Sequence, residues 1–169
     1  MPSNLLKPEG ITGNVFDKIG RGWMLITAGT PEKFNTMTAS WGGLGVLWGK
    51  NVAFCFVRPQ RYTYEFMESS DVYTLGFFPE KYRPQLVVCG GVSGRDTDKV
   101  EATGFKPLPT PDGGVYFQES ELVIVCRKIY ADDFKPELFL SPELAGIYPG
   151  HDYHRMYIGE ITAVYEDKD

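Results

Sequence analysis

The segment Asn35–Trp41 (Asn-Thr-Met-Thr-Ala-Ser-Trp) combines one amide and three hydroxyls with a methionine, an alanine and an indole. A flat heteroaromatic ligand with an imide edge requires that mixture, because a few fixed hydrogen bonds orient it and broad apolar faces cover it. The alternative is structural, a turn rich in capping residues that leads into a strand. The candidate ring-binding residues are Asn35, Thr36, Met37, Thr38, Ala39, Ser40 and Trp41.

Two later segments are places where a loop is expected to enter a helix. The first, Arg58-Pro-Gln-Arg-Tyr-Thr63, offers two guanidinium groups and a hydroxyl beside the free amides of a helix N-terminus, which attract phosphate. The second, Ser93-Gly-Arg-Asp-Thr-Asp-Lys99, has the same character. Each segment could instead hold ordinary surface charges. Two of them in one small protein favour an anionic ligand, with Arg58, Arg61, Tyr62, Thr63, Ser93, Arg95 and Lys99 as candidates.

His154 lies just before an expected strand, in Asp-Tyr-His-Arg-Met. It is the candidate catalytic residue, and a purely structural role is the alternative. With only two histidines the chain cannot build a multi-histidine metal site, so no metal is expected. The three cysteines have no CxxC spacing and indicate neither zinc nor a disulfide framework. Cys55 and Cys126 are predicted to be buried thiols, and Cys89 precedes a Gly-Gly loop.

Other nucleotide and hydrolase motifs are absent from the sequence. Gly42–Trp48 is not GxGxxG because tryptophan occupies the last position. Neither GxxxxGK[ST] nor GxSxG occurs. A P-loop nucleotide site and a serine hydrolase therefore have little support.

Composition limits the class of protein further. The 169 residues predict one domain, 1–169, and the net charge of −5 with a pI of about 5.1 argues against a nucleic-acid partner. No apolar run approaches the roughly 20 residues of a membrane helix, so no membrane partner is expected. The first residues lack the apolar stretch of a signal peptide, and we expect a cytoplasmic protein.

Strand signals dominate the chain, and three short helices interrupt them. Strands are predicted at 23–27, 51–57, 72–78, 116–117, 122–130 and 156–165, and the segment 36–48 changes from polar to glycine-rich. Helices are predicted from Arg61, over 84–89 and over 96–103, the last with Asp96 as N-cap and Gly104 at its left-handed end. Residues 131–152 are predicted to form a long loop. A doubly wound parallel sheet is thereby disfavoured, and a small closed or partly open barrel fits better.

These motifs together resemble the flavin reductase-like, flavoredoxin-type family. The matching segments follow one another in order: Asn35–Trp41, Val57–Phe66, Cys89-Gly with Ser93–Lys99, and Asp152–Glu160. They cover roughly residues 22–164. One such motif would be weak evidence, whereas four in order are specific.

The resemblance implies a mainly β fold, the FMN-binding split β-barrel, an antiparallel Greek-key barrel with short α-helical insertions, usually a homodimer. It implies that Asn35–Ser40 line the isoalloxazine ring with Trp41 nearby, and that Arg58, Arg61, Tyr62 and Thr63 surround the ring and phosphate arm. Ser93, Arg95 and Lys99 would complete the phosphate and ribityl contacts, and His154 would approach the ring. The chain stops soon after its last strand, so a C-terminal contact found in longer relatives is expected to be absent.

The function implied is an FMN-dependent oxidoreductase or electron carrier. A reduced nicotinamide, NADH or NADPH, would reduce the flavin, which would pass electrons to free flavin, a metal chelate or a protein. The main alternative is a module that holds FMN, or another flat cofactor such as haem, without nicotinamide turnover. A structural barrel with an empty pocket is the other alternative.

Overall fold

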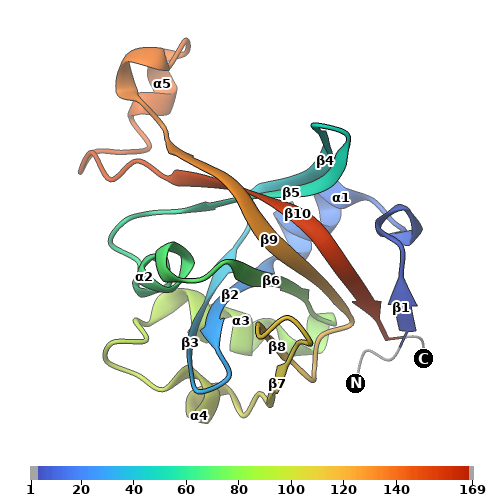
Figure 1. Cartoon of the computed structure of the whole chain (residues 1–169). Helices are drawn as coiled ribbons and strands as arrows, with labels where there is room; N and C mark the ends of the chain where they lie inside the picture. The colour runs from blue at the N-terminus through green and yellow to red at the C-terminus, as the bar shows by residue number, and fades with distance from the viewer. Residues whose placement is uncertain (1–3, 168–169) are drawn as a thin grey trace.

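A curved antiparallel sheet organises the protein, whose computed structural model describes residues 4–167. The strand order is β3-β2-β6-β9-β10-β5-β4, and the short strand β1 pairs with β10. Strands β9 and β10 are the longest and cross the whole molecule (Figure 1). The strands of this sheet are β1 (Asn4–Leu6), β2 (Met24–Thr30), β3 (Lys33–Ala39), β4 (Gly42–Leu47), β5 (Lys50–Val57), β6 (Val72–Phe77), β9 (Leu122–Asp133) and β10 (Arg155–Glu166). A separate two-stranded sheet contains β7 (Pro107–Pro109) and β8 (Val115–Phe117).

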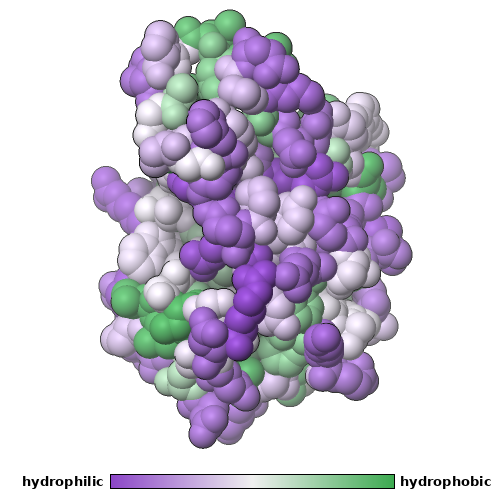
Figure 2. All heavy atoms as spheres, turned by 90° about the vertical axis from the view of Figure 1, so that its left-hand side faces the viewer, coloured by the Kyte–Doolittle hydropathy of each residue, from purple (hydrophilic) through white to green (hydrophobic). Residues whose placement is uncertain are grey.

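Short helices fill the connections between strands, as the sequence predicts. They are α1 (Val15–Asp17), α2 (Tyr62–Ser69), α3 (Arg83–Gly91), α4 (Lys99–Thr103) and α5 (Pro142–Ala145), with a π-helical turn η2 (Lys18–Gly22) and 3-10 turns η1 (Pro8–Gly10), η3 (Glu80–Tyr82) and η4 (Pro136–Leu138). Helices α2, α3 and α4 gather on one side, whereas α5 projects from one end (Figure 1). Seen from the side of α2 and α4, hydrophilic surface predominates between smaller hydrophobic areas (Figure 2).

The interpretation of residues 35–41 as a capping-rich turn is wrong, because residues up to Ala39 belong to strand β3. This strand pairs with β2 residue by residue, from Thr30↔Lys33 to Met24↔Ala39. Polar residues of β3 can be buried because they form hydrogen bonds with residues of the neighbouring strand β2. The hydroxyl oxygens of Thr27 and Thr36, for example, lie 2.8 Å apart. The tight connection between Thr30 and Lys33 fixes that register.

Two further expectations are corrected by the structure. Helix α4 begins at Lys99 rather than near Asp96, because Asp98 is the residue whose carboxylate accepts from the amides of Val100 and Glu101. Gly104 ends it in the left-handed conformation, as predicted. The loop predicted over 131–152 is shorter, since β9 continues to Asp133 and the turns η4 and α5 follow.

The barrel interior is packed with large apolar side chains. Met24, Ile26 and Tyr157 are among its fully buried members. Cys55 and Cys126 are buried free thiols there, as predicted, and Cys89 is also buried, within α3 rather than in a loop. Within residues 4–167 no helix is long and apolar enough to cross a membrane. The same residues contain no cluster of three histidine, cysteine or acidic side chains able to hold a metal.

Candidate functional site

Strand β3 forms one edge of the sheet, so one side of its main chain has no neighbouring strand. Its polar side chains are mostly engaged inside the protein. The hydroxyl of Thr36 is bonded within the barrel, the Asn35 amide donates to Thr63 Oγ1 at 2.8 Å, and Thr38 Oγ1 donates to the Leu86 carbonyl at 2.5 Å. The side chains of Asn35, Thr36 and Thr38 therefore position the strand, and its main-chain edge is what remains for a ligand's polar groups.

A cavity of about 230 Å³ opens beside the end of this strand. Its walls are formed by Met37, Thr38, Ala39, Ser40, Trp41, Phe56, Arg58, Arg61 and His154. The Trp41 indole is half exposed, and its ring centroid lies 5.2 Å from that of His154. The structure thus brings the second half of the first sequence segment together with His154 in one cavity. We refer to this space as the ring cavity.

His154 is buried at the start of β10 and is fixed by Tyr148, which sequence reasoning missed. The Tyr148 hydroxyl lies 2.7 Å from His154 Nδ1. The pKa of His154 is lowered to about 4, mainly by burial and also by the positive charge of Arg58, while the negative charge of Asp152 opposes both. The imidazole is therefore neutral at pH 7. Nothing in the sequence signalled Tyr148, because it lies in an aperiodic segment.

A second cavity, of about 140 Å³, lies where α2 begins, and Arg61 lines both cavities. No side chain caps the N-terminus of α2, whose first residue is Tyr62. We refer to this space as the anion pocket. Its lining residues are Asn35, Gln60, Arg61, Tyr62, Thr63, Gly90, Gly91, Val92, Ser93, Gly94 and Lys99. Of the glycines, Gly91 has open space where a side chain would begin.

Two cations of the anion pocket, the half-buried Arg61 and the buried Lys99, have no acidic partner among the described residues. Arg61 donates from Nη1 to the Gly90 carbonyl at 3.2 Å, and its Nη2 is buried without any partner there. Lys99 is 6% exposed and donates from Nζ to the carbonyls of Thr36, at 2.6 Å, and Cys89, at 2.8 Å. The pKa of Lys99 is lowered to about 8, mainly by burial; Cys89 acts in the opposite direction, and the charge of Arg61 adds to the lowering. An unpaired buried charge is costly, so this arrangement fits a phosphate.

The other two predicted arginines are paired with carboxylates. Arg58 Nη1 lies 2.7 Å from Asp152 Oδ2, and Arg95 Nη2 lies 2.5 Å from Glu65 Oε1. The Arg95 guanidinium also covers the Tyr62 ring at 4.7 Å. Arg95 does not line the anion pocket, because Glu65 and the ring of Tyr62 hold its guanidinium, and its expected contact with a phosphate stays a prediction.

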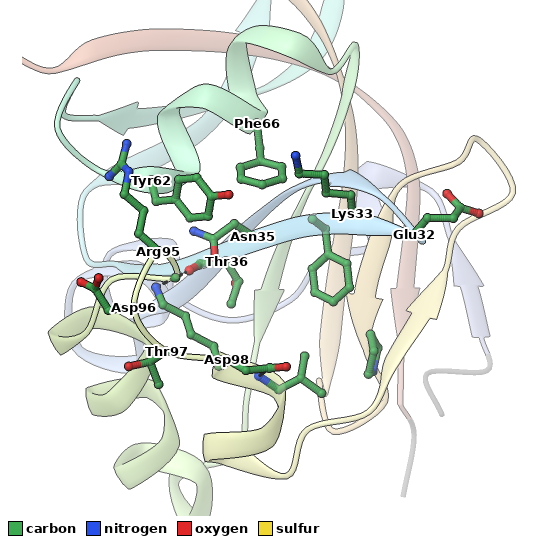
Figure 3. A pocket seen from close by; sticks show the side chains of 15 residues that line it. Glu32, Lys33, Asn35, Thr36, Tyr62, Phe66, Arg95, Asp96, Thr97 and Asp98 are labelled. Carbon is green, nitrogen blue, oxygen red and sulfur yellow. Dashed lines mark hydrogen bonds between the residues drawn. The ribbon is translucent and has the colours of Figure 1, made fainter.

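Arg95 instead lines a third cavity, of about 560 Å³, on the far side of the loop. Figure 3 shows Tyr62 and Phe66 on one side of it and the residues 96–98 on the other. Four residues line both this cavity and the anion pocket: Asn35, Tyr62, Gly94 and Lys99. An added Cβ on Gly94 would clash with Asn35 Oδ1, so the loop packs directly on Asn35. Ser93 remains on the anion-pocket side, where its Oγ accepts from the Arg95 amide at 3.2 Å.

The curved sheet with helices in its connections is that of a split-barrel protein, and Arg61 lines both the ring cavity and the anion pocket. The model of the flavin reductase like domain matches residues 16–169, and the chain belongs to that family. No curated protein matches the chain.

Solved structures share the fold at low sequence identity. The FMN-binding protein from Thermus thermophilus with bound p-hydroxybenzaldehyde is 17% identical over 86% of this chain and 71% of its own, with a TM-score of 0.69. Flavoredoxin from Methanosarcina acetivorans is 21% identical over 87% and 69%, also with a TM-score of 0.69. An FMN-binding domain of a flavin reductase-like enzyme from Shewanella baltica is 14% identical over 97% and 76%, with a TM-score of 0.70.

Proposed function

We propose that the protein binds FMN and acts as an oxidoreductase, taking electrons from NADH, NADPH or a protein donor and passing them to an acceptor. The observation that carries the proposal is the unpaired, buried Nη2 of Arg61 beside the buried ammonium of Lys99. The family and the names of the similar structures support a flavin as the ligand. When bound, FMN would supply the redox chemistry that no protein side chain offers.

The phosphate of FMN is assigned to the anion pocket. Arg61 and Lys99 supply charge, Ser93 and Thr63 supply hydroxyls, and the uncapped start of α2 at Tyr62 supplies main-chain donors. Charge-assisted hydrogen bonds of this kind are about twice as strong as neutral ones, so the phosphate contributes strongly to affinity.

The isoalloxazine ring is assigned to the ring cavity. Met37, Ala39 and Trp41 offer apolar surface there, and the free edge of β3 near Ser40 offers main-chain hydrogen bonds. His154 is neutral, so it can interact with a ring or a nicotinamide through hydrogen bonds without placing a positive charge beside it. Donors in this position stabilise negative charge that develops on a reduced ring.

A homodimer is part of the proposal. Apolar side chains of the projecting segment between β9 and β10 are exposed, with Leu140 97% and Leu138 64% accessible. Surfaces of this kind commonly mark protein contacts. Sedimentation analysis at several concentrations tests the dimer, and a monomer at all of them would contradict it.

One experiment separates the proposed function from its alternatives. Purified protein is loaded with FMN and mixed with NADH or NADPH in anaerobic buffer. Bleaching of the flavin band is expected for the reductase, whereas an intact band indicates a carrier fed by another protein. A protein that gains no thermal stability from FMN binds none, because a ligand of the native state must raise stability by mass action.

A further inference from the structure

The segment that projects between β9 and β10 returns to the barrel at His154, and one of its side chains is buried there. Tyr148 is 6% exposed although its neighbour Ile147 is 39% exposed. Its ring lies 6.0 Å from Phe139 and 5.0 Å from Tyr153, so aromatic packing holds it. Tyr148 therefore has a fixed position on the side of His154 that faces the projecting segment.

Charged groups reinforce that position. The Arg58 guanidinium lies 5.0 Å from the centroid of the Tyr148 ring, and the ion pair with Asp152 holds Arg58 in place. Gln60 donates to the same carboxylate at 2.5 Å. The groups that face the imidazole are thus the phenol of Tyr148, the cation of Arg58 and the anion of Asp152, with Arg61 lining the same ring cavity.

The direction of the hydrogen bond between Tyr148 and His154 follows from the phenol's need for an acceptor. Among the described residues, His154 Nδ1 is the hydrogen-bond partner of the buried Tyr148 hydroxyl, at 2.7 Å, so the phenol hydrogen has an acceptor when it points at Nδ1. Burial raises the pKa of Tyr148, so the phenol keeps that hydrogen at neutral pH. A neutral imidazole has one N–H, and a nitrogen that accepts cannot also carry it.

We propose that Tyr148 is a positioning residue that holds His154 in the tautomer protonated on Nε2, so that the imidazole offers one fixed hydrogen-bond donor to the ring cavity. The ligand group that it suits is an acceptor: a carbonyl oxygen or unprotonated nitrogen at the edge of a heteroaromatic ring. This choice of ligand rests on the proposed function, whereas the tautomer itself does not.

Nitrogen NMR of protein with ¹⁵N-labelled histidine tests the tautomer without added flavin. The chain has two histidines, and a His151→Gln variant assigns them. In the wild type we expect His154 Nδ1 to resonate as an unprotonated nitrogen and Nε2 as a protonated one. Protonation of Nδ1 in the wild type would overturn the inference, whatever any variant does.

The variant Tyr148→Phe keeps the ring and removes the hydroxyl. We expect a mixture of the two tautomers and a rise in the pKa of His154, because a donor to the neutral form is lost. Tyr153→Phe is the matched control: the Tyr153 hydroxyl lies 3.2 Å from Nδ1 of the exposed His151, so the His154 signals are expected to stay unchanged. An unchanged His154 spectrum in Tyr148→Phe would contradict the proposal.

The same variants loaded with FMN connect the tautomer to function. We expect Tyr148→Phe to slow flavin reduction about fivefold, the usual value of one net hydrogen bond, with little change in the Kd of FMN. If the wild type binds no FMN, the proposed function fails while the tautomer result stands. If FMN binds normally but His154 is protonated on Nδ1 instead of Nε2, only this inference fails.

Discussion

The candidate site uses its arginines in two opposite ways. Arg58 and Arg95 each reach a carboxylate, on Asp152 and Glu65, and their charges are neutralised within the protein. Arg61 has a buried nitrogen with no partner among the described residues, and the ammonium of Lys99, which lines the same pocket, donates only to main-chain carbonyls and meets no described carboxylate. The paired arginines fix the walls of the site, whereas the unpaired cations are free to bind an anion.

The largest expected effect is that of Arg61→Ala. Hydrogen bonds to charged groups contribute about 1.5–3 kcal/mol, so the Kd of FMN should rise on the order of 10- to 100-fold. The ligand-free variant should be at least as stable as the wild type, because an unpaired buried charge is removed. Flavin fluorescence titration and thermal unfolding measure both. Unchanged FMN affinity would show that the phosphate is bound elsewhere.

Lys99→Met sharpens the comparison through pH. The pKa of Lys99 is about 8, and a bound phosphate favours the charged form, so wild-type FMN affinity should fall as pH rises above 8. Between pH 8 and the ordinary value of 10.5, the folded protein holds fewer protons on this group than the unfolded chain. The free energy of unfolding of the ligand-free wild type should therefore rise with pH across that window, relative to the methionine variant. If the free energy of unfolding of the two proteins changed with pH in the same way, Lys99 could not be the buried group with a lowered pKa.

Arg95→Ala should have a smaller effect. Its ion pair with Glu65 is partly exposed, and such pairs contribute roughly 0–1 kcal/mol. We expect the Kd of FMN to rise less than fivefold, mainly through faster release, because the guanidinium stabilises the loop rather than touching the phosphate. Stopped-flow dissociation measures this, with the Glu65→Gln variant as the matched partner. If Arg95→Ala raised the Kd of FMN as much as Arg61→Ala, Arg95 would have to contact the phosphate directly.

The smallest effect concerns His154. With a pKa of about 4, it stays neutral from pH 5 to 8, so flavin reduction should show no inflection near the ordinary histidine value of 6.5. In the folded state its proton affinity is lowered, so its contribution to stability is lost only as pH falls from 6.5 towards 4. A rate profile over pH 5–8 checks this, with His154→Gln as the control. An inflection near 6.5 that disappears in the variant would contradict the buried, neutral imidazole.

Local patterns predicted most of the fold. Strands over 51–57, 122–130 and 156–165 and the helix that starts after Arg61 follow from β-branched runs and a change of period, and the structure confirms them. The start of α4 was misplaced because Asp96 and Asp98 are both good capping residues. In the structure the amides of Asp96 and Thr97 donate to the Ser93 carbonyl in a turn, and the Asp98 carboxylate caps the helix that follows.

The site was less predictable because it depends on partners that are distant in the sequence. Nothing local distinguishes Arg58 from Arg61; the difference arises because Asp152 reaches the first and no described carboxylate pairs with the second. Tyr148 could not be found either, since the segment around it has no periodicity and its role appears only when it packs on His154.

The central claim is that Arg61 and Lys99 recognise a phosphate at the end of a flat ligand. Parallel titration of the wild type with FMN and with riboflavin, which lacks the phosphate, tests it most directly. We expect FMN to bind on the order of 100-fold more tightly, and Arg61→Ala to reduce that preference by at least about tenfold. Equal affinity of the wild type for the two flavins would contradict the account.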